Sequence, residues 1–162
     1  MKQLVLFTTL FILSSAQAKE FIYCSQLDDE SSEITWYDFE TAVDLAKEDK
    51  KPIFIDIYTG WCGWCKKMDA DTYSKPDIAK LINKNFIPVK FNPELKQSYE
   101  VNGQTMSGPE LLSMLSGGQR IGYPTTFFLS TEKNKVQMVS GYKGPEDFAQ
   151  ILEQKIEWAK SK

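Results

Sequence analysis

Strand-like and helix-like hydrophobic patterns alternate along the chain from about residue 36 to its end. Two nearly continuous apolar runs, Ile53–Tyr58 and Phe86–Phe91, favour buried β-strands. A polar turn separates Thr125–Leu129 from Val136–Val139, which is typical of a β-hairpin. Apolar residues at helical spacing predict helices before the first strand, between the first two strands and at the C-terminus.

The order of these elements predicts an α/β fold. Helical sequence separates the first two strands, so we expect them to pair in parallel. Pro88 lies inside the second strand and cannot donate a ladder hydrogen bond, which indicates either an edge strand or the start of a strand. The last two strands should pair antiparallel. We therefore expect a three-layer sandwich, with a mixed central sheet and helices on both faces.

Residues 92–122 form a long connection before the hairpin. It contains a predicted short helix, residues 109–116, which Gly117-Gly118 should stop. Long ordered connections often carry function, so we hypothesise that this one forms a flap or partner surface beside the active site. An insertion that has no function of its own is the alternative.

The chain divides into three segments by its pattern. Residues 1–18 are expected to be a signal peptide, residues 19–35 a loose N-terminal arm, and residues 36–162 a single folded domain. The first helix of the domain is expected to start after Thr35, with Asp38 completing a capping box.

The first segment has the organisation of a secretory signal. Lys2 precedes a ten-residue apolar run, and Ala16-Gln17-Ala18 follows as a cleavage motif. The apolar run is too short to span a bilayer, although an uncleaved anchor is the alternative. We therefore expect an exported protein, with the bacterial periplasm as the favoured compartment and no membrane insertion of the mature chain.

Composition narrows the possible chemistry. The 162 residues include 19 basic and 22 acidic ones, and a net charge of −3 argues against nucleic-acid binding. The chain has no histidine, which excludes Ser-His-Asp and Cys-His catalysis and histidine-bound metals. Three cysteines are too few for a four-cysteine zinc site. We expect no metal and no cofactor, which leaves thiol chemistry or binding alone.

Cys62 and Cys65 bracket two residues at the start of a predicted helix, directly after a buried strand. A helix start stabilises a thiolate, so Cys62 is expected to be the exposed attacking thiol with a lowered pKa. Cys65 lies one turn further on and should be the more buried, resolving thiol. A purely structural disulfide is the alternative, though so short a loop would gain little stability. Cys24 has no assigned partner and could be a spare thiol, an inter-chain bridge or a secondary partner of the site.

The run Trp61–Lys66 follows the strand Phe54–Tyr58, and Gly122–Thr125 lies far downstream. Together these motifs resemble the thioredoxin superfamily over about residues 36–160. The chain is most similar to exported thioredoxin-like proteins and to the C-terminal periplasmic domain of transmembrane thiol:disulfide interchange reductants. It departs from thioredoxins proper in having Gly63-Trp64, not Gly-Pro, between the cysteines, which leaves its redox potential open.

The resemblance implies a role for several residues. Cys62 and Cys65 would form the redox-active disulfide, and Asp56 would be the buried carboxylate that exchanges a proton with Cys65. Burial in an apolar strand should raise the pKa of Asp56; a tolerated polar residue is the alternative. Pro124 would be the cis-proline, and Tyr123 before it would pair with an extended substrate.

Trp61, Gly63 and Trp64 flank the thiols and are further candidates for substrate contact. For Trp61, packing against its own sheet is the favoured expectation.

These observations predict an exported thiol–disulfide oxidoreductase that reduces disulfides of client proteins. A membrane or soluble thiol donor would supply its electrons. A disulfide oxidant or isomerase is the first alternative. A thioredoxin-fold binding or chaperone-like module without turnover is the alternative from another class.

Overall fold

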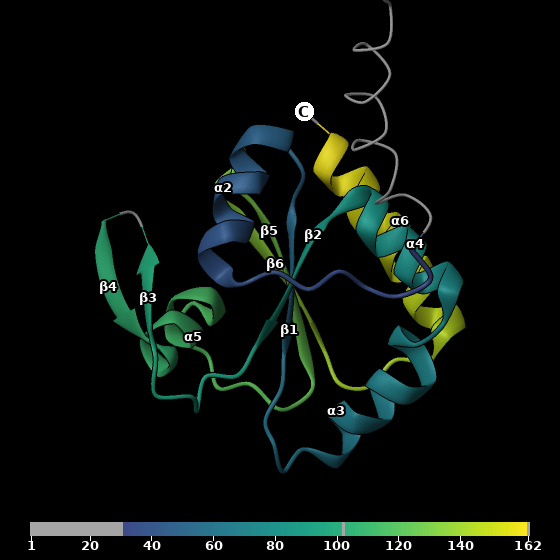
Figure 1. Ribbon diagram of the computed structural model, residues 1–162, viewed down its shortest axis with the longest axis horizontal. Coiled ribbons are helices and arrows are strands. Elements are labelled where there is room, and N and C mark those ends of the chain that lie inside the picture. The colour runs from purple at the N-terminus through teal and green to yellow at the C-terminus, as the bar shows by residue number, and fades with distance from the viewer. Residues whose placement is uncertain (1–30, 102, 162) are drawn as a thin grey trace, which may run out of the picture.

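A four-stranded sheet lies at the centre of the computed structural model, which describes residues 31–101 and 103–161 (Figure 1). The strand order is β2-β1-β5-β6. The strands are β1 (Ile53–Ile57), β2 (Ile87–Phe91), β5 (Thr125–Ser130) and β6 (Lys135–Ser140). β1 pairs parallel with β2 and antiparallel with β5, and β5 pairs antiparallel with β6. The predicted mixed sheet is confirmed.

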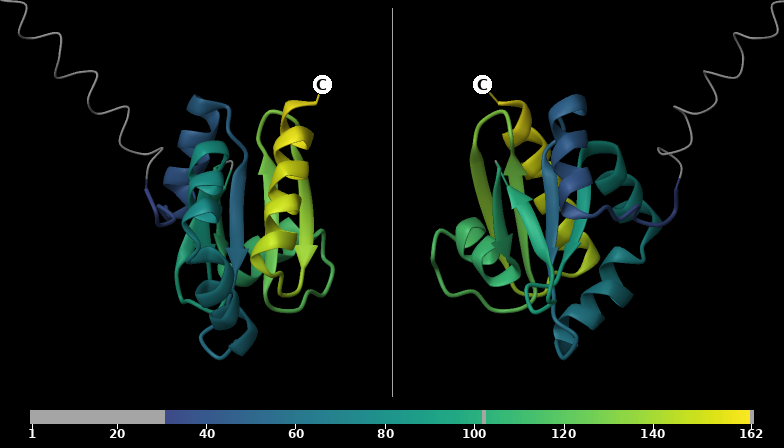
Figure 2. Two further views of the ribbon diagram at one scale, coloured as in Figure 1. Left: turned by 90° about the vertical axis from the view of Figure 1, so that its right-hand side faces the viewer. Right: turned by 60° about the vertical axis from the view of Figure 1, so that its left-hand side comes forward.

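Helices cover both faces of this sheet (Figures 1 and 2). One face carries α2 (Phe39–Asp49) and α5 (Gly108–Ser116), together with a small hairpin of β3 (Ser98–Val101) and β4 (Gln104–Ser107). The other face carries α3 (Gly63–Met68), the π-helix η1 (Asp69–Tyr73), α4 (Pro76–Asn85) and α6 (Pro145–Lys160). The three-layer sandwich is therefore confirmed. Within the described ranges, no helix combines the length and the apolar character needed to cross a bilayer.

The side chains of β1 alternate between these two layers, although the whole strand is buried. Ile53, Ile55 and Ile57 belong to the core under α2 and α5. Phe54 belongs to the core under α4 and α6, and Asp56 points to the same side by alternation. The central strand thus brings a carboxylate into one of two apolar layers.

The two edge strands of the sheet differ in what lies on their outer sides. β2 is an edge strand, as Pro88 predicts, and Tyr37 adds an isolated bridge to Val89 on its outer side. The backbone N–H of Tyr37 donates to the carbonyl of Pro88 at 2.9 Å. β6 forms the opposite edge, where Val136 and Met138 are exposed.

The first helix begins later than the sequence indicates. Asp38, not Thr35, is the N-cap of α2, and its carboxylate accepts the backbone N–H of Thr41 at 2.8 Å. The N–H of Thr35 donates to the side chain of Asn83 at 3.0 Å, and Asn83 also donates to the carbonyl of Glu33. The predicted capping box of Thr35 and Asp38 is wrong, because the backbone of Thr35 is hydrogen-bonded to Asn83 of α4 instead. The expected signal peptide, Cys24 and the arm up to residue 30 lie outside the described residues.

The connection of residues 92–122 is more regular than predicted. Its helix is confirmed as α5, which Gly117 ends with φ 61°, but the β3–β4 hairpin before it was not predicted. Leu111 and Leu115 anchor α5 in the core. Gly108 lies so close to Pro93 that a Cβ there would sit 2.4 Å from the Pro93 carbonyl oxygen. The connection is therefore an ordered extension of the α2 layer.

Candidate thiol–disulfide site

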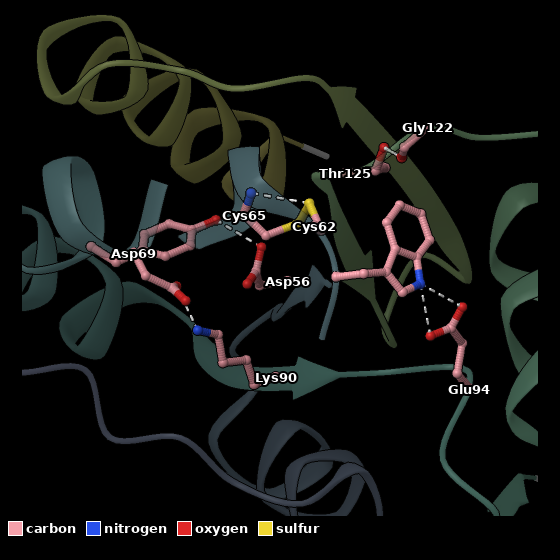
Figure 3. The surroundings of a disulfide bond; sticks show 10 residues. Asp56, Cys62, Cys65, Asp69, Lys90, Glu94, Gly122 and Thr125 are labelled. Carbon is pink, nitrogen blue, oxygen red and sulfur yellow. Dashed lines mark hydrogen bonds and ion pairs between the residues drawn. A yellow bond between two sulfur atoms is a disulfide. The ribbon is translucent and has the colours of Figure 1, made fainter. Parts of the chain in front are cut away.

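Cys62 and Cys65 form a disulfide at the point where β1 gives way to α3 (Figure 3). The S–S distance is 2.05 Å and the Cα–Cα distance is 5.3 Å. Cys62 is the N-cap of α3, and its sulfur accepts the backbone N–H of Cys65 at 3.0 Å. An amide that donates to this sulfur favours its thiolate over its thiol, because it stabilises negative charge at the helix start.

Both cysteines are buried in this disulfide form. Cys62 is 4% exposed and Cys65 is 3% exposed. The expectation of a buried Cys65 is confirmed, but that of an exposed Cys62 is wrong for this state. The bridge and the amide contact draw the Cys62 sulfur back over the first turn of α3.

Asp56 is among the residues that surround the disulfide (Figure 3). It is only 2% exposed, and its Oδ1 accepts a hydrogen bond from the Tyr73 hydroxyl at 3.1 Å. Loss of solvent raises the pKa of this carboxyl from 3.8 to about 7. Lys90 lowers the pKa, Asp69 raises it, and the hydrogen bond from Tyr73 lowers it. The predicted upward direction is confirmed, and the group titrates near neutral pH.

Lys90 of β2 is the register partner of Asp56 of β1, so the two residues lie next to each other on adjacent strands. Its ammonium forms an ion pair with Asp69 of η1. It also lies over the rings of Trp36 and Tyr58, at 5.4 and 5.3 Å from their centroids. The charge of Lys90 is therefore shared with Asp69, which leaves burial as the dominant effect on Asp56.

Trp61 lies at the rim of the site and is 67% exposed. Its indole N–H donates to both carboxylate oxygens of Glu94 at 3.1 Å (Figure 3). Its ring meets that of Tyr123 edge-on, with centroids 5.6 Å apart. The expected packing of Trp61 against its own sheet is wrong, because Glu94 and Tyr123 hold the ring outward.

The other predicted contact residues belong to α3 and to the segment before β5. Trp64 is exposed and packs against Tyr142, with centroids 5.6 Å apart. Gly63 is the first residue of α3, and a Cβ there would meet nothing within 4 Å. The Tyr123–Pro124 peptide bond is cis, as expected.

A pocket of about 450 Å³ adjoins this rim on the α5 side. Glu94 and Tyr123 belong both to the contacts of Trp61 and to the pocket wall. Leu112 and Ile121 supply apolar surface, and Arg120, the only arginine of the chain, also lines the pocket. The 92–122 connection thus builds a hollow next to the residue that precedes Cys62.

Sequence reasoning missed three residues of this arrangement: Lys90, Tyr73 and Glu94. The signal for Lys90 was present, because parallel pairing of the two strands sets it opposite Asp56. No spacing rule connects Tyr73 to Asp56 or Glu94 to Trp61, since 17 and 33 residues separate them.

The sheet order, the Cys-x-x-Cys disulfide at a helix start and the cis-proline define a thioredoxin fold with a site like that of thiol–disulfide oxidoreductases. More particularly, the chain belongs to the family described as Thioredox_DsbH, protein of unknown function, DUF255. The family model matches residues 17–159.

Two curated relatives match the chain over small parts of their own length. Human spermatogenesis-associated protein 20 is 30% identical over 116 residues, which cover 70% of this chain and 14% of that protein. The thiol:disulfide interchange protein DsbD of Vibrio vulnificus strain CMCP6 is 28% identical over 92 residues, which cover 57% of this chain and 14% of DsbD. The chain therefore spans about a seventh of each.

Solved structures share the fold. A structure titled DsbH Oxidoreductase has a TM-score of 0.60 at 16% identity, covering 79% of this chain and 88% of that one. A thioredoxin from Thermus thermophilus has a TM-score of 0.57 at 19% identity, covering 75% and 86%. The oxidised C-terminal domain of Neisseria meningitidis DsbD has a TM-score of 0.51 at 20% identity, covering 75% and 99%.

Proposed function

We propose that this protein is an exported thiol–disulfide oxidoreductase that reduces disulfides in client proteins. The observation that carries the proposal is the Cys62–Cys65 disulfide, whose Cys62 sulfur accepts the backbone N–H of Cys65 in the first turn of α3. In the reduced protein this hydrogen bond favours Cys62 as the more stable of the two thiolates. The similarity to part of a thiol:disulfide interchange protein supports the exchange reaction. The resemblance of the motifs to transmembrane thiol:disulfide interchange reductants favours the reducing direction, and the signal-like sequence of residues 1–18 favours export.

The reaction consists of two thiol–disulfide exchanges. In the reduced protein, the Cys62 thiolate attacks a client disulfide, forms a mixed disulfide and releases one client thiolate. Cys65 then gives its proton to the Asp56 carboxylate and attacks the Cys62 sulfur. This step releases the second client thiolate and restores the Cys62–Cys65 disulfide. The client gains two electrons, and a membrane or soluble dithiol donor must return two electrons to the protein.

The exposed rim beside the disulfide is the proposed surface for the client. Trp61 and Trp64 offer large aromatic faces, and Tyr123, which contacts Trp61, precedes Pro124 in a cis peptide bond. Glu94, which accepts the indole N–H of Trp61, also lines the pocket beside α5. An extended client segment that passes the disulfide would place its side chains against this surface.

Two cysteine variants test the proposed roles. A Cys65→Ser protein should accumulate a mixed disulfide with a client through Cys62, because the resolving thiol is absent. A Cys62→Ser protein should accumulate none and should lose exchange completely. Mass spectrometry of alkylated samples measures both species, and the same adduct on Cys65 in the Cys62→Ser protein would contradict the assignment.

The equilibrium with glutathione tests the direction. A reduction potential near −270 mV, on the order of thioredoxin's, is expected for a reductant. A value of about −120 to −180 mV would instead mark an oxidant or isomerase. A pair that cannot be cycled would favour the binding or chaperone-like module.

A further inference from the structure

A buried tyrosine touches the carboxylate that belongs to the proposed site. The hydroxyl of Tyr73 donates to Oδ1 of Asp56 at 3.1 Å, and it lies 3.4 Å from the hydroxyl of Thr126. Tyr73 is 5% exposed and Asp56 is 2% exposed, so water does not replace this contact. On the proposed function given above, the state of Asp56 controls the second exchange.

An irregular turn brings Tyr73 to this place. After α3 the chain passes into the π-helix η1, in which the N–H of Ser74 donates to the carbonyl of Asp69, five residues back, at 3.1 Å. π-helical turns are rare overall, but those that occur are frequently found at functional sites. Tyr73 is the last residue of η1, and the next helix begins only at Pro76. The wider turn thus ends on the side chain that reaches Asp56.

The aromatic surroundings of Tyr73 do not account for its hydroxyl. Its ring packs edge-on against Phe54, Phe148 and Trp36, with centroids 5.5 to 5.9 Å apart. A phenylalanine would make the same ring contacts. Burying a hydroxyl in such a cluster is unfavourable unless the group is hydrogen-bonded. The hydroxyl therefore points to a role for its hydrogen bond to Asp56.

We propose that Tyr73 is a positioning residue for the redox reaction: its hydroxyl orients Asp56 and favours the ionised carboxylate that accepts the proton of Cys65. The charged and titratable groups around Asp56 are Lys90 of β2, with Asp69 and Tyr73 of η1. Lys90 is paired with Asp69, so Tyr73 is the group that donates directly to the carboxylate.

The donor stays protonated throughout the working range. Burial and the neighbouring Asp56 raise the pKa of Tyr73 well above 10. A phenol that donates to a carboxylate favours the ionised form, since the hydrogen bond is stronger to a charged acceptor. Removal of the hydroxyl leaves burial unopposed by this bond, and Asp56 then keeps its proton to a higher pH.

A Tyr73→Phe variant tests the inference because it keeps the ring and removes only the hydroxyl. The measured quantity is the single-turnover rate of disulfide release, between pH 5 and pH 9, with a peptide disulfide. The acid limb of this profile should move upward by about one pH unit. The rate should fall about tenfold well below the limb and should match the wild-type rate at its upper end.

Two further variants serve as controls. Tyr99→Phe removes the hydroxyl of another buried tyrosine, which lies on the opposite face of the sheet and accepts a hydrogen bond from Gln97. Its acid limb should stay in place. Asp56→Asn should lose the limb, and adding Tyr73→Phe to it should cause no further pH-dependent change.

A second readout does not depend on turnover. Carbon-13 NMR of labelled aspartate follows the Asp56 carboxyl directly, and its midpoint should rise in Tyr73→Phe. A uniform loss of rate at every pH, or an unmoved midpoint, would overturn the inference. If the wild-type protein reduced no disulfide while the midpoint moved, the proposed function would fail and the hydrogen bond would have no catalytic meaning.

Discussion

The two faces of β1 are equally buried but chemically unlike. Toward α2 and α5 the strand presents Ile53, Ile55 and Ile57, all without exposed surface. Toward α4 and α6 it presents Phe54 and the carboxyl group of Asp56. The first face contributes hydrophobic burial alone, which does not depend on pH. The second face combines an aromatic cluster with an ionisable group.

This difference predicts how stability depends on pH. The pKa of Asp56 is about 7 in the folded protein and close to 3.8 when the chain is unfolded. Below pH 3.8 both states hold the proton, so the carboxyl does not reduce stability. As the pH rises to 7, the unfolded chain releases its proton first and the folded state is progressively disfavoured. The ionisable carboxyl of Asp56, on the face toward α4 and α6, should therefore destabilise the fold at neutral pH.

Asp56→Asn should produce the largest change in this comparison. Ionisation of the carboxyl is expected to reduce the free energy of unfolding by about 4 kcal/mol between pH 4 and pH 8, on the order of 1.4 kcal/mol per unit of pKa difference. The variant should lack this decline and be more stable than the wild type at pH 8. Urea unfolding of the oxidised proteins at both pH values measures the effect. Parallel declines in both proteins would refute it.

Ile55→Val should have a smaller effect on the opposite face. Removing one buried methylene creates a small cavity and should lower stability by about 0.5–1.5 kcal/mol. The loss should be the same at pH 5 and pH 8, because no titratable group is involved. Unfolding curves at the two pH values check this, and a pH-dependent loss would show that the two faces are coupled.

Glu94→Ala should have the smallest effect and should concern the client alone. Without its carboxylate partner, Trp61 loses its fixed orientation at the rim. We expect kcat/KM for a protein client to fall by about twofold to fivefold, as is typical of exposed charged contacts. The rate with hydroxyethyl disulfide should stay unchanged. Lys96→Ala, two residues along, is the matched control; an equal loss there would remove the role of Glu94.

Much of the fold could be predicted because its signals are local. The continuous apolar run of β1 and Pro88 in β2 indicated a buried strand and an edge strand. The β3–β4 hairpin escaped because its residues are mostly exposed and polar, so no hydrophobic alternation marks it. Its Asn102-Gly103 dipeptide was a usable turn signal.

The site was predictable only where its residues lie in the motif. Cys62 and Cys65 could be named from their spacing at a predicted helix start, whereas the role of Asp56 came from the resemblance to the thioredoxin superfamily. Tyr73 reaches Asp56 through a π-turn, which ordinary helical periodicity does not describe. The orientation of Trp61 depends on Glu94, which a separate connection supplies.

The unequal edges of the sheet have a consequence for aggregation. An unpaired strand edge is a template on which another chain can add a strand. At β2 this is hindered by Pro88, which has no N–H to offer, and by the bridge from Tyr37. Among the described residues β6 has no neighbouring strand on its outer side, and it exposes Val136 and Met138. Concentrated or partly unfolded protein should therefore self-associate through β6, where a charged residue in place of Val136 would act as a gatekeeper.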